Sequence, residues 1–403
     1  MRTAVIFIAL TIIGLLDYYA LSVHNCWYLT ACGILAFPFF ISFFLVSALK
    51  SVGVITGKIP DAIGAAFFSV LIALIVFEGI LRLLKMNPTY LETIGQSAYL
   101  SLYDPGMKNA FWHVYEPNDT THVSRGDFFY SRRFNSMGLA EREVNLKDTG
   151  TKKILCLGDS FTEGVGTVAD STWPRELERA LNTCSRDSYL VYNAGVSGCD
   201  PVYNYHLLRG KLWDVNWKAV IFCVNGTDLP EVLIRGGMER FKPGNKVAYA
   251  NPRVWEPLYG SLYIVRYLVL DILKYDWTLH PVSESKQLNI TSAQKIRDVL
   301  INAQSELNQR GVEMLVVIHP LSYDATKGVY NGYMDTLKSK LVIVKPLDML
   351  PYFLDSAGLT KNNYTDYYWP NDGHFKTLGY RVMGHKVYTE LAGRMKIECN
   401  KNH

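Results

Sequence analysis

The stretch KKILCLGDSFTEGVGT, residues 152–167, decides how the rest of the chain is interpreted. Residues 153–157 form a short apolar run, typical of a strand that is buried on both faces of a parallel sheet. The tripeptide Gly-Asp-Ser at 158–160 follows where that strand should end, and two more glycines come soon after. Either the turn needed small residues and Ser160 only caps the next helix, or Ser160 is held out for chemistry.

The chain beyond this turn alternates between strand-like and helix-like patterns. Further apolar runs predict strands at residues 189–193, 218–224, 313–319 and 340–347. Helical spacing of apolar residues marks 172–182, about 291–311, and the region from about 377 onward. Residues 229–288 are expected to form a long irregular insertion. Strands that alternate with helices predict a parallel sheet between helical layers, which binds ligands beyond the carboxyl ends of its strands.

The first ninety residues hold three long apolar segments, at residues 4–23, 26–49 and 63–84. Each approaches or exceeds the roughly 20 residues that a helix needs to cross a bilayer. One cleaved signal peptide, the alternative explanation, cannot account for three segments. We therefore predict a membrane anchor over residues 1–88 with about three transmembrane helices.

Charges around these segments favour a cytoplasmic amino terminus. Arg2, Lys50 and Lys58 would then face the cytoplasm, whereas Arg82 and Lys85 would fall on the far side, which the positive-inside rule disfavours. Three basic residues thus favour this orientation and two oppose it. With a cytoplasmic amino terminus, three membrane spans place the large domain outside the cytoplasm. The prediction is a multi-pass membrane protein with its main domain on the periplasmic face of the inner membrane.

Composition sets further limits. Residues 89–150 are rich in aromatic and turn residues, which predicts a connecting region packed on a main domain at 151–403. A net charge of +4 without a basic cluster is too mild to indicate a nucleic-acid partner. No Cys-x-x-Cys pair or histidine cluster has metal-ligand spacing, so we expect no metal and no organic cofactor. One disulfide among Cys184, Cys199 and Cys399 would suit an extracytoplasmic domain.

Four sequence blocks carry a resemblance to a known superfamily. GDSFTEG, residues 158–164, resembles the first block of the SGNH (GDSL-type) hydrolases. The later blocks follow in the family's order as NAGVSG (193–198), NGTD (225–228) and NDGHFKTLGY (371–380). NSMGLAEREV, residues 135–144, resembles a segment found before the first block in membrane-linked bacterial members. The resemblance covers roughly residues 135–395 and implies a flavodoxin-like three-layer α/β/α fold.

The resemblance also implies a catalytic triad, and the residue types suit that chemistry. Ser160 would be the nucleophile, activated by His374 as general base. Asp372, two residues before the histidine, would orient the imidazole and stabilise its charged form. Some members place the acid three residues before the histidine, but that position is Asn371 here. His319, at the end of a predicted strand, is the alternative base.

The resemblance further implies an oxyanion hole. The backbone N–H groups of Ser160 and Gly198 would supply two donors. The family's usual third donor is an asparagine side chain, which aligns with Thr227 here, while Asn225 lies two residues earlier. Losing such a donor typically costs about 10²- to 10³-fold in turnover. Asp159 is interpreted as a structural turn residue outside the triad.

We therefore predict a membrane-anchored SGNH hydrolase that cleaves an acyl ester through an acyl-enzyme on Ser160. The expected substrate is an O-acyl group on a cell-surface glycan, or a small ester or lipid. One alternative is a glycan O-acyltransferase with the same triad, which the sequence cannot separate from an esterase. Another is a non-catalytic carbohydrate-binding protein that works with polysaccharide-assembly partner proteins.

Overall fold

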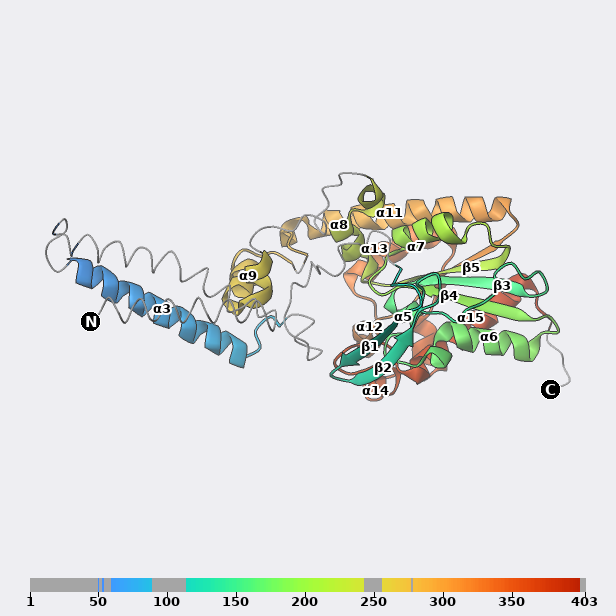
Figure 1. Ribbon diagram of the computed structural model, residues 1–403, viewed down its shortest axis with the longest axis horizontal. Helices are drawn as coiled ribbons and strands as arrows, with labels where there is room; N and C mark the ends of the chain where they lie inside the picture. Colours follow the sequence, from blue (N-terminus) through green and yellow to red (C-terminus); the bar gives the residue numbers. More distant parts are fainter. Residues whose placement is uncertain are drawn as a thin grey trace. The chain divides into compact units, whose positions relative to one another are not determined.

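The computed structural model divides the chain into two compact units (Figure 1). One unit comprises residues 1–104 and 252–282, and the other comprises residues 105–251 and 283–403. The described residues are 50, 53, 59–88, 114–242, 256–276 and 278–398. The predicted domain boundaries at 88 and 150 stay predictions.

A five-stranded parallel sheet forms the centre of the second unit. Its strands are β3 (Lys152–Gly158), β4 (Tyr189–Gly195), β5 (Trp217–Val224), β6 (Glu313–Ile318) and β7 (Leu347–Asp348). Their spatial order is β4-β3-β5-β6-β7. In chain order this is 2-1-3-4-5, the flavodoxin-like arrangement, whose direction of winding reverses between β3 and β5. The predicted α/β fold with a parallel sheet is therefore confirmed.

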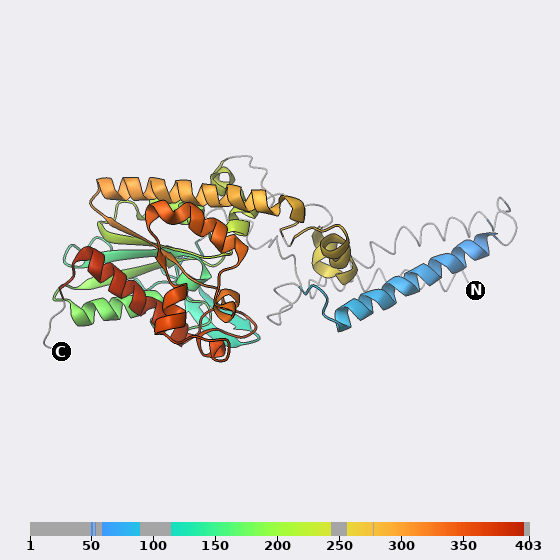
Figure 2. The ribbon, with the colours of Figure 1, turned by 180° about the vertical axis from the view of Figure 1, so that it is seen from behind.

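Helices cover both faces of this sheet, as Figures 1 and 2 show. One face is packed by α6 (Trp173–Cys184) and α15 (Thr377–Met395). The opposite face is packed by α7 (Pro201–Leu207), α11 (Val282–Gln309) and α13 (Gly332–Leu341). The short helices α12 (Ser322–Lys327) and α14 (Tyr364–Tyr367) complete the described part of this unit beyond β6. The result is a three-layer arrangement.

The packing explains why β3 is apolar without alternation. Ile154 and Cys156 point into the core on the α6 and α15 face. Leu155 and Leu157 point into the core on the α7, α11 and α13 face. All four are fully buried, and burial of a large aliphatic side chain contributes roughly 1.5–3 kcal/mol.

The strand predicted at residues 340–347 is wrong. Helix α13 runs into this segment and a short 3-10 turn follows, so only the two residues of β7 join the sheet. Leu341 and Val344 are buried three residues apart, whereas Val342 and Ile343 between them are 70% and 62% exposed. The burial therefore follows a helical spacing, which an uninterrupted apolar run conceals.

The insertion predicted as irregular at residues 229–288 is largely helical in its described part. Helix α11 also begins at Val282, earlier than the predicted start near Thr291. The additional elements are α8 (Asp228–Arg235), a 3-10 helix (Gly237–Phe241), α9 (Glu256–Ser261), α10 (Tyr263–Arg266) and a π-helical turn (Tyr267–Ile272). Such short helices span too few turns to show a clear apolar period in the sequence.

A hairpin precedes the sheet in the chain. Strands β1 (Thr120–Arg125) and β2 (Phe128–Arg133) pair antiparallel around a two-residue turn, with Arg125 opposite Phe128. Arg132 anchors the hairpin to the main domain, because its buried guanidinium donates to the carbonyl oxygens of Gly164 (2.7 Å) and Thr167 (3.0 Å). The described part of the predicted connecting region thus contains loops and short strands that pack on the sheet.

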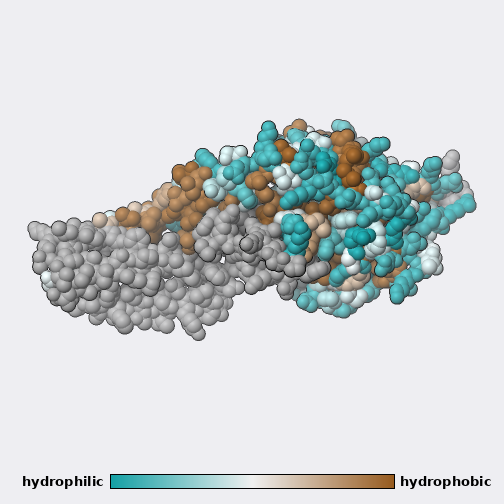
Figure 3. Space-filling view, turned by 90° about the horizontal axis from the view of Figure 1, so that it is seen from above, coloured by the Kyte–Doolittle hydropathy of each residue, from teal (hydrophilic) through white to brown (hydrophobic). Residues whose placement is uncertain are grey.

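The first unit contains helix α3 (Ile59–Leu83), which coincides with the third apolar segment. Many of its apolar side chains are exposed, including Ile72, Ile75 and Leu83. Hydrophobic residues, coloured brown, are visible on the surface in Figure 3. Near its end, Glu78 accepts hydrogen bonds from Arg82 Nε and from two backbone N–H groups at the start of α10.

No helix in the described ranges is both long and apolar enough to span a bilayer. The transmembrane helix predicted at residues 63–84 is therefore unsupported as a membrane crossing. The segments predicted to span at 4–23 and 26–49 lie outside the described residues.

The cysteines correct one prediction. Cys184 is disulfide-bonded. Cys156, Cys199 and Cys223 are buried free thiols. Cys199 is thus excluded from the predicted disulfide, and it packs as a small apolar residue of the core.

Candidate active site

Ser160 is the first residue of α5 (Ser160–Glu163), at the carboxyl end of β3. The helix cap is the neighbouring Asp159, whose carboxylate accepts a hydrogen bond from Phe161 N at 2.9 Å. The interpretation of Ser160 as the cap is therefore wrong, and its hydroxyl is available. Gly164 ends α5 at a φ of +96°, and a Cβ atom there would lie 2.2 Å from Thr172 Cγ2. Only glycine fits this position.

The structure brings together the three side chains that the sequence predicts as a triad. His374 Nε2 lies 2.7 Å from Ser160 Oγ. His374 Nδ1 is hydrogen-bonded to Asp372 Oδ1. A tight turn before α15 holds the pair, because Gly373 N donates to Trp369 O (2.9 Å) and Trp369 N donates to His374 O (2.8 Å). The imidazole is therefore placed between a hydroxyl and a carboxylate.

Asp372 is held in its charged form. Burial disfavours that charge, but the hydrogen bond and charge of His374, together with the guanidinium of Arg125, hold the pKa of Asp372 well below its usual range. Arg125 Nη1 lies 2.6 Å from Asp372 Oδ2. Each oxygen of this carboxylate thus has a partner of its own.

Two backbone N–H groups could receive a developing oxyanion. Ser160 stands at the first turn of α5, and Gly198 lies in the loop after the neighbouring strand β4. Neither N–H has an acceptor within the part of the chain that the structure describes. Glu163 joins the two segments, because its Oε2 accepts from both Ser197 N and Ser197 Oγ at 2.7 Å. Tyr115 donates its hydroxyl to the same oxygen at 2.7 Å.

The predicted third oxyanion donor is engaged elsewhere. Thr227 donates its hydroxyl proton to Asn225 Oδ1 at 2.8 Å. Asn225 Nδ2 donates to Asp159 Oδ2 at 2.7 Å and lies 3.3 Å from His319 Nε2. Thr227 therefore donates to Asn225, and Asn225 in turn donates to Asp159. An oxyanion role for Asn225 or Thr227 stays a prediction that requires these bonds to change.

His319, the alternative base, does not contact Ser160. It is fully buried, and burial lowers the pKa of its imidazole. Its Nε2 faces Asn225, and its ring lies 4.6 Å from the ring of Phe161, which stands between the two histidines. The structure places His374 against the serine.

Sequence reasoning missed three charged residues around this site: Arg125, Asp127 and Glu163. Glu163 belongs to the first motif block, but its link to Ser197 depends on the packing of two loops. Arg125 and Asp127 lie in the turn region of the β1–β2 hairpin and contact the Asp372 loop. Arg125 and Asp372 are 247 residues apart, so no local pattern connects them.

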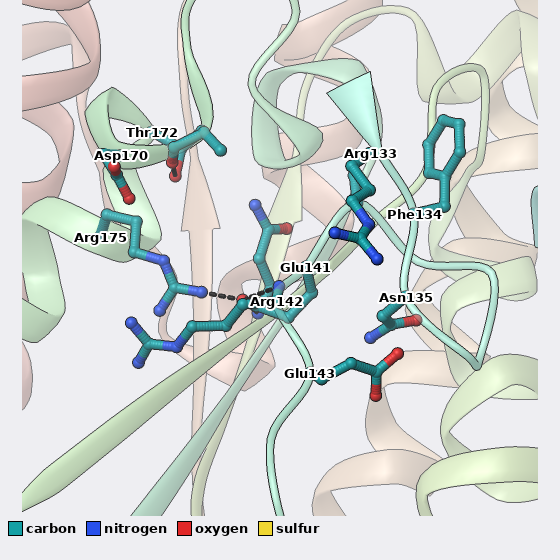
Figure 4. A pocket seen from close by; sticks show the side chains of 12 residues that line it. Arg133, Phe134, Asn135, Glu141, Arg142, Glu143, Asp170, Thr172 and Arg175 are labelled. Atoms are coloured by element: carbon teal, nitrogen blue, oxygen red, sulfur yellow. Dashed lines mark hydrogen bonds and ion pairs between the residues drawn. The ribbon is translucent and has the colours of Figure 1, made fainter. Parts of the chain in front are cut away.

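A separate cavity of about 350 Å³ lies beside α6 and does not include the triad. Figure 4 shows Arg175 and Glu141 joined by an ion pair beside it. Glu141 also accepts from the backbone N–H groups of Arg142 (2.6 Å) and Asn193 (2.7 Å). Its buried charges satisfy one another, so we assign no ligand to this cavity.

Among known proteins, only solved structures are similar to this chain. No protein-family model and no curated protein sequence matches the chain. Forty-seven chains of solved structures are similar to it. One, described as a lipolytic protein of the G-D-S-L family from Desulfitobacterium hafniense, is 14% identical, with a TM-score of 0.34, over 59% of this chain and 99% of its own length.

Two further structures illustrate the range of these neighbours. A lipase/acylhydrolase from Enterococcus faecalis is 12% identical, with a TM-score of 0.37, over 63% of this chain and all of its own length. A two-domain esterase active on acetylated mannans is 11% identical, with a TM-score of 0.36, over 61% of this chain and 50% of its own. Only the first of the three is described by the G-D-S-L name that the first sequence block resembles. Similarity at this level identifies no function, so we rely on the site itself.

Proposed function

We propose that the protein is an SGNH-type serine hydrolase that cleaves an acyl ester through Ser160, His374 and Asp372. The observation that carries this proposal is the continuous chain of hydrogen bonds from Ser160 Oγ through His374 to Asp372. Its position at the carboxyl ends of the strands, next to the reversal between β3 and β5, is where open α/β sheets bind ligands.

The geometry supports a two-step reaction. In the first step, Ser160 Oγ attacks the ester carbonyl carbon while His374 Nε2 accepts the hydroxyl proton. The negative charge on the carbonyl oxygen is stabilised by the N–H groups of Ser160 and Gly198. The tetrahedral intermediate collapses to an acyl-enzyme, and the leaving alcohol takes the proton from His374. In the second step, His374 activates a water that releases the carboxylic acid and regenerates the serine.

The alcohol side of the substrate is proposed from the resemblance of the four sequence blocks. We propose an O-acyl group on a cell-surface glycan, or on a small ester or lipid. Hydrolysis and transfer to a sugar hydroxyl use the same three side chains. No feature of the described site favours the transferase, so we propose hydrolysis.

We also propose that the domain works outside the cytoplasm on a membrane anchor. The long apolar segments at residues 4–23 and 26–49 of the sequence support the anchor. The disulfide at Cys184 supports an oxidising compartment, because such bonds rarely persist in the cytosol.

The proposed function is tested by covalent labelling of the full chain. A fluorophosphonate probe should modify Ser160, identified by mass spectrometry, and the same protein should hydrolyse p-nitrophenyl acetate. Ser160→Ala and His374→Ala should each remove labelling and lower turnover by about 10³-fold or more, because members of a triad act as a unit. Ser188→Ala is the matched control. Ser188 is exposed and lies at the amino end of β4, whereas Ser160 follows the carboxyl end of β3. Wild-type labelling of Ser160→Ala would contradict the proposal.

A further inference from the structure

The β1–β2 hairpin holds the loop that carries the proposed acid and base. Arg125, the last residue of β1, bonds Asp372 Oδ2 at 2.6 Å. Asp127, in the turn of the hairpin, accepts three hydrogen bonds from the same loop. Its donors are Asn371 N (2.8 Å), Asn371 Nδ2 (2.7 Å) and Asp372 N (2.8 Å). Arg125 at the end of β1 and Asp127 in the turn thus hold this loop by its carboxylate and by its backbone.

We propose that Arg125 is a positioning residue of the triad, which fixes the outer oxygen of Asp372 so that the inner oxygen faces His374. The inference rests on the proposed function, because it assigns a role within the same site. Arg125 does not touch Ser160 or His374 in any contact of the described structure, so it acts through Asp372.

The contact is suited to hold a fixed geometry. The side chain of Asp372 is 1% exposed and that of Arg125 is 20% exposed, so water competes weakly for the ion pair. Removing one partner of such a pair leaves an uncompensated charge. The carboxylate could then rotate away from His374, and a misplacement of about 1 Å in a triad can cost roughly 10²-fold in rate.

The hairpin is itself firmly attached near the nucleophile. Arg132 on β2 donates to the carbonyl oxygens of Gly164 and Thr167, in the loop that follows α5. The ring of Phe128 packs 5.3 Å from that of Trp369, and Trp369 Nε1 donates to Gly166 O at 3.0 Å. The hairpin, the loop after Ser160 and the loop before His374 are therefore mutually braced.

Because Arg125 is charged, its positioning role should be visible in the pH dependence of the reaction rate. Among the residues that the structure describes, the titratable or charged groups near the Asp372–His374 pair include Arg125 and Asp127 on the hairpin, Asp159 beside the nucleophile, and buried His319. The guanidinium of Arg125 is one of the groups that hold the pKa of Asp372 below its usual range. Removing it raises the pKa of Asp372, and a protonated Asp372 cannot orient the imidazole or stabilise its charged form. The acid limb of the pH–rate profile should then move to higher pH.

The experiment follows the pH dependence of fluorophosphonate labelling and of p-nitrophenyl acetate hydrolysis in the full chain. Arg125→Gln should lower the limiting rate by about 10-fold or more and move the acid limb to higher pH. Arg125→Lys, which keeps the charge, should restore the position of the limb and part of the rate. Asp127→Asn removes a negative charge and should move the limb the opposite way. Arg133→Gln is the matched control, because Arg133 is exposed at the far end of the same hairpin.

Two other results for Arg125→Gln would overturn the inference that Arg125 positions Asp372. A lower rate in Arg125→Gln without any shift of the acid limb would indicate only a structural contact. A raised KM with unchanged kcat would indicate that Arg125 binds substrate. Thermal unfolding of each variant verifies folding, and Arg125→Lys and Asp127→Asn keep the test decisive if Arg125→Gln does not fold. An unlabelled wild-type Ser160 would refute the proposed function instead, so the two failures are distinguishable.

Discussion

At the scale of single residues, Asn225, which lies two residues before the position that aligns with the superfamily's asparagine, is the most informative member of the third block. Its amide is 1% exposed and links Thr227, Asp159 and the neighbourhood of His319. Asp159 in turn caps the helix that presents Ser160. Asn225 thus supports the turn that carries Ser160, through its hydrogen bond to Asp159.

This arrangement predicts unequal effects of substitution in the third block. Asn225→Ala should destabilise the fold by about 1–3 kcal/mol, because it leaves the buried Asp159 oxygen without its donor. It should also lower turnover. Thr227→Val removes only a bond at the start of α8 and should change turnover by less than about 3-fold. Chemical denaturation and ester hydrolysis measure both effects. A loss of 10-fold or more in Thr227→Val, with normal stability, would show that its hydroxyl serves the oxyanion after all.

At the scale of elements, the position of Ser160 depends on how closely α5 approaches β4. Gly195, at the end of β4, faces the backbone of α5. A Cβ atom there would lie 2.2 Å from Glu163 N and 2.5 Å from Thr162 C. Backbone cannot move aside as a flexible side chain can, so the contact admits only glycine.

Gly195→Ala should therefore displace α5 and destabilise the domain by about 1–3 kcal/mol, as overpacking typically does. Ester turnover should fall with it, because Ser160 starts that helix. Gly393→Ala on α15 is the control, since a Cβ atom there meets nothing within 4 Å. That substitution should stabilise the helix by about 0.5–1 kcal/mol. Equal melting temperatures for the two variants would contradict this account of the packing.

At the scale of the whole molecule, stability should depend on pH through Asp228. Burial and the neighbouring charge of Asp159 raise the pKa of this fully buried carboxyl well above its ordinary value. Below about pH 4 the carboxyl is protonated in both the folded and unfolded states and contributes nothing. Above that pH the unfolded state ionises first, so the group increasingly disfavours folding. The stability gained by Asp228→Asn should therefore grow from pH 4 toward neutral pH.

Unfolding free energies of wild type and Asp228→Asn, measured by denaturant at pH 4 and pH 7, test this dependence. The asparagine oxygen can still accept the hydrogen bond from Asn225 N, which Asp228 Oδ2 accepts at 2.7 Å. A difference between the two proteins that stays constant with pH would show that Asp228 is not the responsible group.

The proposed membrane anchor and its orientation concern the whole molecule. A reporter that is active only outside the cytoplasm should work when fused after His403 and fail when fused at Gly57. The charges that favour this orientation differ by only three against two. The reverse reporter pattern would place the hydrolase domain in the cytoplasm and refute the proposed location.

The sequence by itself determined the parts of this protein that depend on local pattern. The apolar runs that became β3, β4, β5 and β6 are visible because a buried parallel strand needs apolar residues on both faces. Ser160, Asp372 and His374 could be named because their motif blocks resemble those of the SGNH hydrolases and occur in the same order. The apolar run at residues 340–347 was wrongly predicted as a strand, because an unbroken apolar run does not reveal whether its buried residues follow helical spacing.

Only the tertiary structure decided which side chains meet across long stretches of chain. Arg125 reaches Asp372 over 247 residues because a hairpin folds against the loop before α15. Asn225 turns its amide toward Asp159 because β5 lies next to β3 in the sheet. Such pairings depend on the packing of whole elements and on the burial of charge, and neither quantity is encoded in the spacing of nearby residues.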